Sequence, residues 1–300
     1  TEGVTPQQSC EAHKRPSLVV QLMTLIAVVL PPAGVVMAMV LLWHVAFNWI
    51  YLALFGAMYV ITAIGITVGY HRLFTHCSFK TPPPVKAALG VFGSMAVQGP
   101  LLTWVAVHPK HHQCSDDERD PHSPRAFGDG VIGMVRGFLH AHLGWMFRQE
   151  PGDLHRYAGD LRKDKLMRGV SKLFLVWAAL GLIIPAIVGG LVTGTWTGVL
   201  LGFIWGGLVR VFFGHHVTWS INSVSHLWGS RPFHCHDESR NNVVFGVLAF
   251  GEGWHNNHHA FPSSARHGLR WWQIDVSYLI IRGMGLIGLA RDIRGPARAR

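Results

Sequence analysis

The chain has 300 residues, of which 49% are hydrophobic and only 14% are charged, and its mean hydropathy is +0.27. Soluble domains carry roughly 25% charged residues, so this composition argues against a soluble globular protein and favours an integral membrane protein. The formal net charge of +10 is expected at a surface that meets anionic lipid headgroups, and without a separate basic soluble domain we expect no nucleic-acid binding.

Four apolar segments are long enough to cross a bilayer, which takes about 20 residues of helix. They lie at 19–43, 49–70, 173–192 and 199–228. Their short connections predict two helical hairpins. We therefore expect an all-α integral membrane protein with one domain over 19–290. Within this domain, 71–172 and 229–290 are expected to form a helical cap, and outside it we expect a polar tail at 1–18 and a basic tail at 291–300.

The two short connections, 44–48 and 193–197, contain no Lys or Arg. The basic residues gather in the tails and in the cap. Because cytoplasmic loops are enriched in Lys and Arg, this distribution predicts that the cap and both termini face the cytoplasm.

Eight histidines form three short boxes, each at the edge of an apolar stretch. The boxes read His71-Arg-Leu-Phe-Thr-His76, His108-Pro-Lys-His111-His112 and His255-Asn-Asn-His258-His259. Residues three and four apart share one face of a helix, so the second and third boxes should each converge on one side. His71 and His76 are about 140° apart at 3.6 residues per turn, so we expect them to reach two neighbouring ions. Eight ligands exceed the four of a closed zinc site, and imidazole suits iron, copper and zinc alike.

A further histidine lies at the end of the fourth apolar segment. Asn222 and His226 are four residues apart and would share a helix face. The segment at 199–228 is about 45 Å long as a helix, whereas the hydrocarbon core takes about 30 Å. Its last turns should therefore project into the cytoplasm and meet the three boxes.

Five motifs resemble those of the membrane-bound fatty acyl desaturases of the stearoyl-CoA desaturase type. They are GITVGYHRLFTH at 65–76, QGPLLTWVAVHPKHH at 98–112, DPH at 120–122, NSVSHLWG at 222–229 and GEGWHNNHHAFP at 251–262. The similarity runs from about residue 48 to residue 285. In that family four transmembrane helices carry a cytoplasmic cap, and nine histidines hold two irons.

The resemblance implies a ligand set for each iron. The first iron would be bound by His71, His112, His226 and His255, with Asn222 reaching it through a water. The second would be bound by His76, His108, His111, His258 and His259. Acidic side chains should orient the imidazole rings, although loop charges or helix caps are an equal alternative. The candidates are Asp116, Asp117, Glu118, Asp120 and Glu252.

The resemblance also implies an acyl tunnel beside the metals. Residues matching Gln98, Trp104, Thr218 and Trp219 line its bend. The two tryptophans have an alternative role as aromatic anchors at the membrane interface.

The implied activity is the O2-dependent insertion of a cis double bond into a saturated acyl chain by a diiron centre. The family favours an acyl-CoA substrate and the delta-nine position. Three departures leave acyl carrier protein or a glycerolipid open as the carrier: Pro109 replaces an Arg, Gly99-Pro100 replaces an Asn-Asp pair, and Arg148-Gln149 replaces an Arg-Lys pair. The sequence contains no cytochrome domain, so we expect a separate donor of the ferredoxin, rubredoxin or cytochrome type with its reductase. A bacterial inner membrane is the expected location.

Two alternatives remain. A hydroxylase or alkane monooxygenase with histidine boxes would use the same metals and form an alcohol. A metal transporter would place its polar groups near the bilayer midplane, whereas these histidines are expected at one membrane face.

Overall fold

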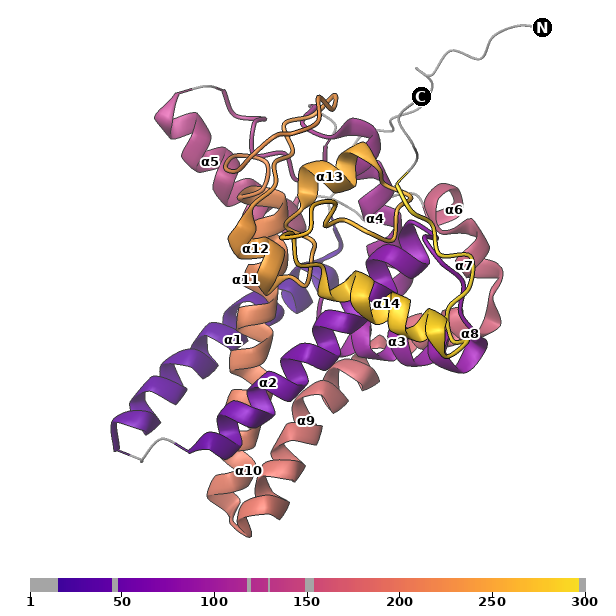
Figure 1. Ribbon diagram of the computed structural model, residues 1–300. Helices are drawn as coiled ribbons and strands as arrows, with labels where there is room; N and C mark the ends of the chain where they lie inside the picture. Colours follow the sequence, from indigo (N-terminus) through magenta and orange to yellow (C-terminus); the bar gives the residue numbers. More distant parts are fainter. Residues whose placement is uncertain (1–15, 45–47, 118–119, 129, 149–153, 297–300) are drawn as a thin grey trace, which may run out of the picture.

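The computed structural model describes residues 16–44, 48–117, 120–128, 130–148 and 154–296 (Figure 1). The described residues form helices joined by loops and contain no strand, which confirms the all-α class. Glu118, Gln149 and most of the predicted N-terminal tail lie outside these residues, as does the chain end at 297–300.

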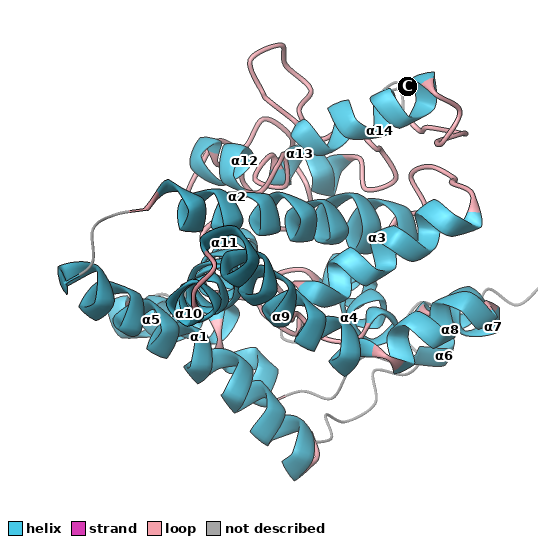
Figure 2. Cartoon of the chain, turned by 90° about the horizontal axis from the view of Figure 1, so that it is seen from below, coloured by secondary structure: helices cyan, strands magenta, loops and turns pink. Residues whose placement is uncertain are grey.

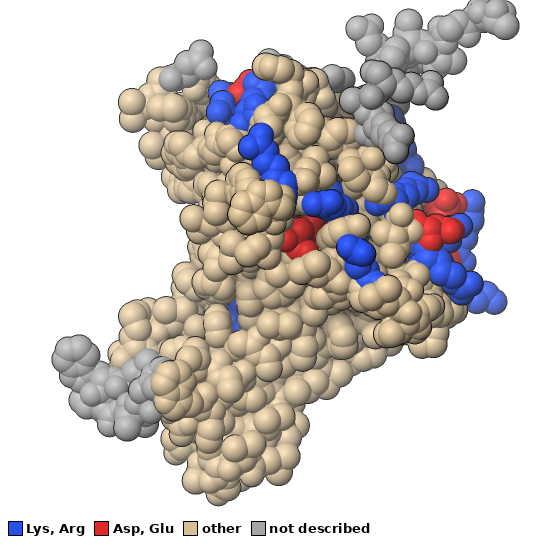
Figure 3. Space-filling model, in the orientation of Figure 1, with Lys and Arg blue, Asp and Glu red and all other residues tan. Residues whose placement is uncertain are grey.

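Four apolar helical rods are long enough to cross a membrane, as predicted. They run over Leu18–Val40, Trp49–Thr75, Phe174–Thr193 and Trp196–Ser223. The helices that form them are α1 (Leu18–His44), α2 (Trp49–Ile64) with η1 (Gly65–Thr75), α9 (Phe174–Thr193), and α10 (Trp196–Gly202) with η3 (Phe203–Val209) and α11 (Arg210–Ser223). Charged side chains gather over the upper part of the molecule and leave the rods almost bare (Figure 3).

The fourth rod is the centre of the bundle. Its segment η3 packs against α1, α2 and α9, and a view along the rods shows α10 and α11 between α1 and α2 (Figure 2). Glycines allow the close approach of α9 and α10, because a side chain at Gly198 or Gly202 would collide with the backbone of α9. The two helices are joined through Gly194, whose φ of 67° ends α9 in the left-handed conformation that glycine tolerates.

Arg210 is a fully buried cation within this bundle. Its Nη1 donates to the carbonyl of Met95 at 2.9 Å, its Nη2 to Gly181 at 2.7 Å and its Nε to Gly206 at 3.2 Å. Three helices are therefore tied together by one guanidinium, and backbone carbonyls satisfy a charge that would otherwise be costly at this depth.

The second rod changes from an α-helix to a π-helix at Gly65. A π-helix closes its hydrogen bonds five residues apart instead of four, and the N–H of His76 accordingly donates to the carbonyl of His71 at 3.0 Å. A side chain at Gly65 would collide with the backbone of Gly93, so glycine lets the helix at 83–95 lie directly on the π-segment.

The remaining helices form the cap. They are α3 (Pro83–Met95), α4 (Leu101–Cys114), α5 (Val131–His142), η2 (Gly144–Phe147), α6 (Leu154–Tyr157), α7 (Gly159–Lys163), α8 (Lys165–Lys172), α12 (Val243–Leu248), α13 (His255–Ala260) and α14 (Val276–Leu286). Their apolar core packs around η1, which contacts α3, α4 and α14. This packing fixes η1, α4, α13 and the end of α11 around one point, where the histidine boxes meet.

Candidate metal centre

Nine histidines of the described residues converge in two groups whose possible ligand atoms lie within 4.8 Å of one another. The five-histidine group contains His71, His76, His108, His112 and His258. The four-histidine group contains His111, His226, His255 and His259. These are the nine predicted from the sequence, and the division into four and five is also as expected. The membership differs. His71 and His112 were expected in the group of four and lie in the group of five, whereas His111 and His259 were expected in the group of five and lie in the group of four.

The expectation that His71 and His76 reach different ions is wrong. Their Nε2 atoms lie 3.1 Å apart and belong to one group. The angle of 140° assumed an α-helix, but η1 is a π-helix, in which residues five apart are one turn apart and share a face.

Each of the other two boxes divides between the groups. In α4, His108 and His112 are four residues apart and their Nε2 atoms are 3.0 Å apart, while His111 turns to the other group. In α13 the Nε2 atoms of His255 and His259 are 3.1 Å apart, while His258 turns to the other group. The i,i+4 pair stays together because it differs by only about 40° around an α-helix, whereas adjacent residues differ by about 100°.

The fourth rod contributes to the four-histidine group from beyond its helical end. The helix α11 ends at Ser223, so His226 lies in the turn that follows and not on the predicted continuous helix. Its Nε2 is 3.1 Å from that of His255. Asn222 lies partly buried in the last turn of α11 and belongs to neither histidine group.

Three aspartates orient rings of the four-histidine group. The Nδ1 of His226 lies 2.9 Å from Asp116, and the Nδ1 of His111 lies 3.0 Å from Asp120. The Nδ1 of His259 lies 2.6 Å from the third aspartate, Asp237. Asp116 and Asp120 were candidates from the sequence. Asp237 was missed, because it lies in a loop remote in sequence from every box, and no spacing pattern connects it to His259.

These hydrogen bonds determine which nitrogen faces inward. An ionised carboxylate only accepts, so His226 and His259 donate from Nδ1, and their Nε2 atoms are left to bind a metal. Both Nε2 atoms lie 3.1 Å from the Nε2 of His255. The buried Nε2 of His111 has no protein hydrogen-bond partner. Imidazole nitrogens that converge in a buried space fit a first-row transition metal.

The five-histidine group is backed by a different network. Glu252 lies 2.5 Å from the Nδ1 of His71 and 3.0 Å from the guanidinium of Arg72. Arg72 also reaches Asp275 at 2.8 Å. The ring of His267 lies beside that of His258, with 4.4 Å between the two ring centroids. The Nδ1 of His267 also lies 3.4 Å from a carboxylate oxygen of Glu252. Sequence reasoning did not select His267, which stands outside the boxes.

Protonation favours metal binding at the five-histidine group. Burial, and then the neighbouring imidazoles, holds the pKa of His108 and His112 well below 6.5, so these rings are neutral near pH 7. Burial would raise the pKa of Asp116, but the His226 hydrogen bond and charge prevail and lower it to about 2. Burial would lower the pKa of His226, but the same contact with Asp116 raises it above 6.5, so this ring releases a proton when a metal binds. Neutral imidazoles backed by ionised carboxylates are the form that binds a metal.

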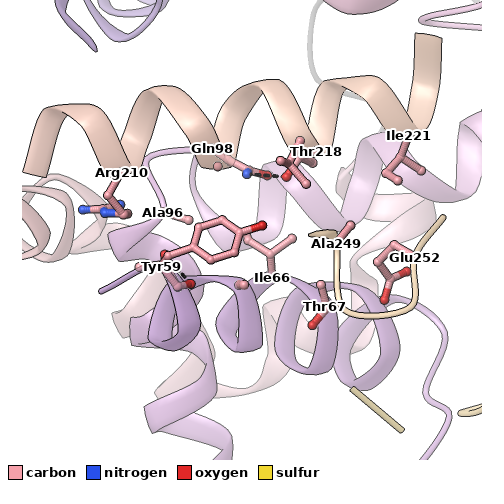
Figure 4. Close-up of a pocket in the computed structure, with 14 residues that line it drawn as sticks. Tyr59, Ile66, Thr67, Ala96, Gln98, Arg210, Thr218, Ile221, Ala249 and Glu252 are labelled. Carbon is pink, nitrogen blue, oxygen red and sulfur yellow. Dashed lines mark hydrogen bonds between the residues drawn. The ribbon is translucent and has the colours of Figure 1, made fainter. Parts of the chain in front are cut away.

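A pocket lies between α2, η1 and α11 (Figure 4). Its walls are largely apolar, and Gln98 donates to the hydroxyl of Thr218 inside it at 2.8 Å. Glu252 also lines this pocket, so the side chain that contacts His71 forms part of the pocket wall.

The other two residues expected in the tunnel are not among those that line this pocket. Trp104 stacks on His108, with ring centroids 5.3 Å apart and planes 15° apart. Trp219 packs against His142 and His215. Trp104 therefore lies directly beside the five-histidine group. Trp219, in α11, contacts histidines that belong to neither group.

Comparisons with known proteins agree with this architecture. The family model for fatty acid desaturases matches residues 47–282. The chain is 43% identical over 270 residues to hex-5-enoyl-[acyl-carrier protein] acetylenase of Moorena producens, which covers 89% of this chain and 84% of that protein. It is 40% identical over 254 residues to sn-1 stearoyl-lipid 9-desaturase of Synechocystis, covering 83% and 74%. It is 38% identical over 257 residues to icosanoyl-CoA 5-desaturase of Limnanthes douglasii, covering 84% and 66%. The chain, with its four apolar helices and its buried histidine centre, therefore belongs to the fatty acid desaturase family of membrane enzymes.

Proposed function

We propose that this protein inserts a cis double bond into a saturated acyl chain, using O2 and two irons held by the nine histidines. The observation that carries the proposal is the connection between the metal centre and the apolar pocket. Glu252 lines the pocket and contacts His71, so a chain bound there lies next to the five-histidine group. We further propose that Asn222 reaches the iron of the four-histidine group through a water, because it lies four residues before His226, at the end of α11.

The bound irons would reduce O2 and supply the oxidant that removes hydrogen from an unactivated alkyl chain. The protein's own part is to hold the chain still and dry. Ile66, Val217 and Ile221 offer apolar contacts, and the hydrogen bond between Gln98 and Thr218 pairs two polar groups that would otherwise hold water in the pocket. The carbon that loses hydrogen is then the one that the pocket wall places beside the metals.

The proposed membrane arrangement follows from charge and from the apolar rods. The four rods cross the bilayer as two hairpins, with the cap and both termini on the cytoplasmic side of a bacterial inner membrane. Electrons then come from a separate cytoplasmic donor of the ferredoxin, rubredoxin or cytochrome type.

The acyl carrier is tested by a direct comparison. The departures at Gly99-Pro100, Pro109 and Arg148-Gln149 reduce the likeness to acyl-CoA enzymes, and the three relatives are named for an acyl-carrier-protein, a lipid and a CoA substrate. We retain an acyl-CoA with delta-nine desaturation as the substrate implied by the resemblance. Purified protein with an electron donor would be given the stearoyl chain on CoA, on acyl carrier protein and in a glycerolipid.

The proposed reaction is tested by expression in a host that lacks its own desaturase. Mass spectrometry of the host lipids should reveal a new double bond and locate it, and the His112→Ala variant should produce none. An alcohol in place of an alkene would show a hydroxylase. A triple bond formed from an alkene would show an acetylenase, and metal uptake without oxidation of any lipid would show a transporter.

We expect Trp104→Ala to change chain-length preference or double-bond position more than iron content. The indole stacks on His108 without binding a metal, so its loss widens the space beside the centre and leaves the ligand in place. Product analysis together with iron quantification checks this. Loss of iron with unchanged double-bond position would show that Trp104 supports His108 and does not shape the tunnel.

A further inference from the structure

The two histidine groups differ in the charge that stands directly behind them. Three carboxylates accept from rings of the four-histidine group, at 2.9 Å from Asp116, 3.0 Å from Asp120 and 2.6 Å from Asp237. In the five-histidine group the carboxylate that contacts a ligand ring is Glu252. The group with fewer imidazoles thus has more anionic support.

A buried cation reduces this support further in the five-histidine group. The guanidinium of Arg72, which is fully buried, lies between Glu252 and Asp275 at 3.0 and 2.8 Å. Two carboxylates and one guanidinium leave about one negative charge near this group.

The three aspartates have no such partner among the described ion pairs. Their described ion pairs are with histidines, and their side chains are 0–7% exposed. Arg231 bonds to the backbone carbonyl of Asp237 and forms its ion pair with Glu238. Arg125 and Arg240 also pair with Glu238, at a surface where these side chains are 29–40% exposed and water screens them.

A carboxylate behind a ligand imidazole makes that ring a stronger donor, and a net negative surrounding stabilises the more highly charged metal. We infer that the two metals are electrostatically unequal, and that in the half-reduced protein the ferric ion resides in the four-histidine group and the ferrous ion in the five-histidine group. This inference rests on the proposed diiron function. It makes Asp116, Asp120 and Asp237 positioning residues that act through their histidines.

The test is Mössbauer spectroscopy of full-length protein loaded with two ⁵⁷Fe ions. Half an equivalent of dithionite, a two-electron reductant that is oxidised to sulfite, converts one of the two ferric ions to ferrous. We expect one ferric and one ferrous component in the wild type. Asp237→Asn should alter the ferric component, and Glu252→Gln should alter the ferrous component.

A second measurement follows iron affinity. Loss of a carboxylate that orients a ligand weakens metal binding by about 10–100-fold. At limiting iron, Asp237→Asn should therefore approach one iron per chain and retain the component assigned to the five-histidine group. Asp116→Asn should respond in the same way, which keeps the test decisive if one variant folds poorly. Asp160→Asn, at a fully exposed aspartate paired with Lys163, is the matched control and should match the wild type.

The reverse pattern, in which Asp237→Asn alters the ferrous component, overturns the inference. So does an equal effect of both variants on both components. Wild-type protein that binds other than two irons refutes the diiron function itself, and the inference is refuted with it. The iron count of the wild type therefore distinguishes the two failures.

Discussion

Replacing His112 with alanine should reduce desaturation to less than about one hundredth of the wild-type rate, since loss of even an indirect contact to a metal ligand costs about 10–100-fold. The Nε2 of His112 lies 3.0 Å from that of His108 and 2.9 Å from that of His258, within the five-histidine group. Its removal leaves four rings around a space shaped for five. The measurements are iron per chain and the amount of unsaturated product.

The matched control is His234→Ala, because His234 is an exposed histidine outside both groups. That variant should keep full iron content and activity. Both variants should reach the membrane in equal amounts, since no apolar helix is changed. Activity of His112→Ala near the wild-type level would refute the assignment of this ring as a ligand.

Replacing Arg72 with leucine should destabilise the protein by about 3–5 kcal/mol, the usual cost of removing one partner of a buried ion pair. The guanidinium binds Glu252 and Asp275 and donates to the carbonyl of Ala265 at 2.7 Å. Its loss leaves two buried carboxylates without their cation. Thermal unfolding in detergent should show a clear decrease in Tm.

Lys163→Leu is the control for the loss of a cation, because this side chain is 83% exposed. Surface substitutions of this kind change the free energy of unfolding by about 0.5 kcal/mol or less. The Tm of Arg72→Lys should lie between those of Arg72→Leu and Lys163→Leu, since an ammonium keeps the charge but lacks the planar fork that spans both carboxylates. An Arg72→Leu unfolding curve that overlays the wild type would contradict this role.

The sequence was sufficient for features that depend on composition and on residue type. Apolar length predicted four rods, and the clustering of His71 through His259 predicted one buried centre. These predictions succeeded because a bilayer requires a minimum apolar length, and because burial of many imidazoles in one place has few causes other than a metal.

Features that depend on local helix geometry could not be predicted in this way. The angle between His71 and His76 was calculated for an α-helix, and the π-helix reversed the conclusion. The π-segment begins at Gly65, where a side chain would collide with the backbone of Gly93, and residue spacing does not encode such a tertiary contact. The role of Asp237 likewise depends on a loop that returns to the centre, which residue spacing does not encode.

The π-helix also has a consequence for the numbering of the first box. A π-turn contains about one residue more than an α-turn, so η1 is equivalent to an α-helix with an inserted residue. The four residues between His71 and His76 therefore fill one turn, and Arg72 begins that turn on the side that meets Glu252 and Asp275. If one of these four residues were deleted, the two histidines could remain neighbours only if the segment returned to α-helical winding. The length of the first box and the winding of its helix are thus a single property, and neither can change without the other.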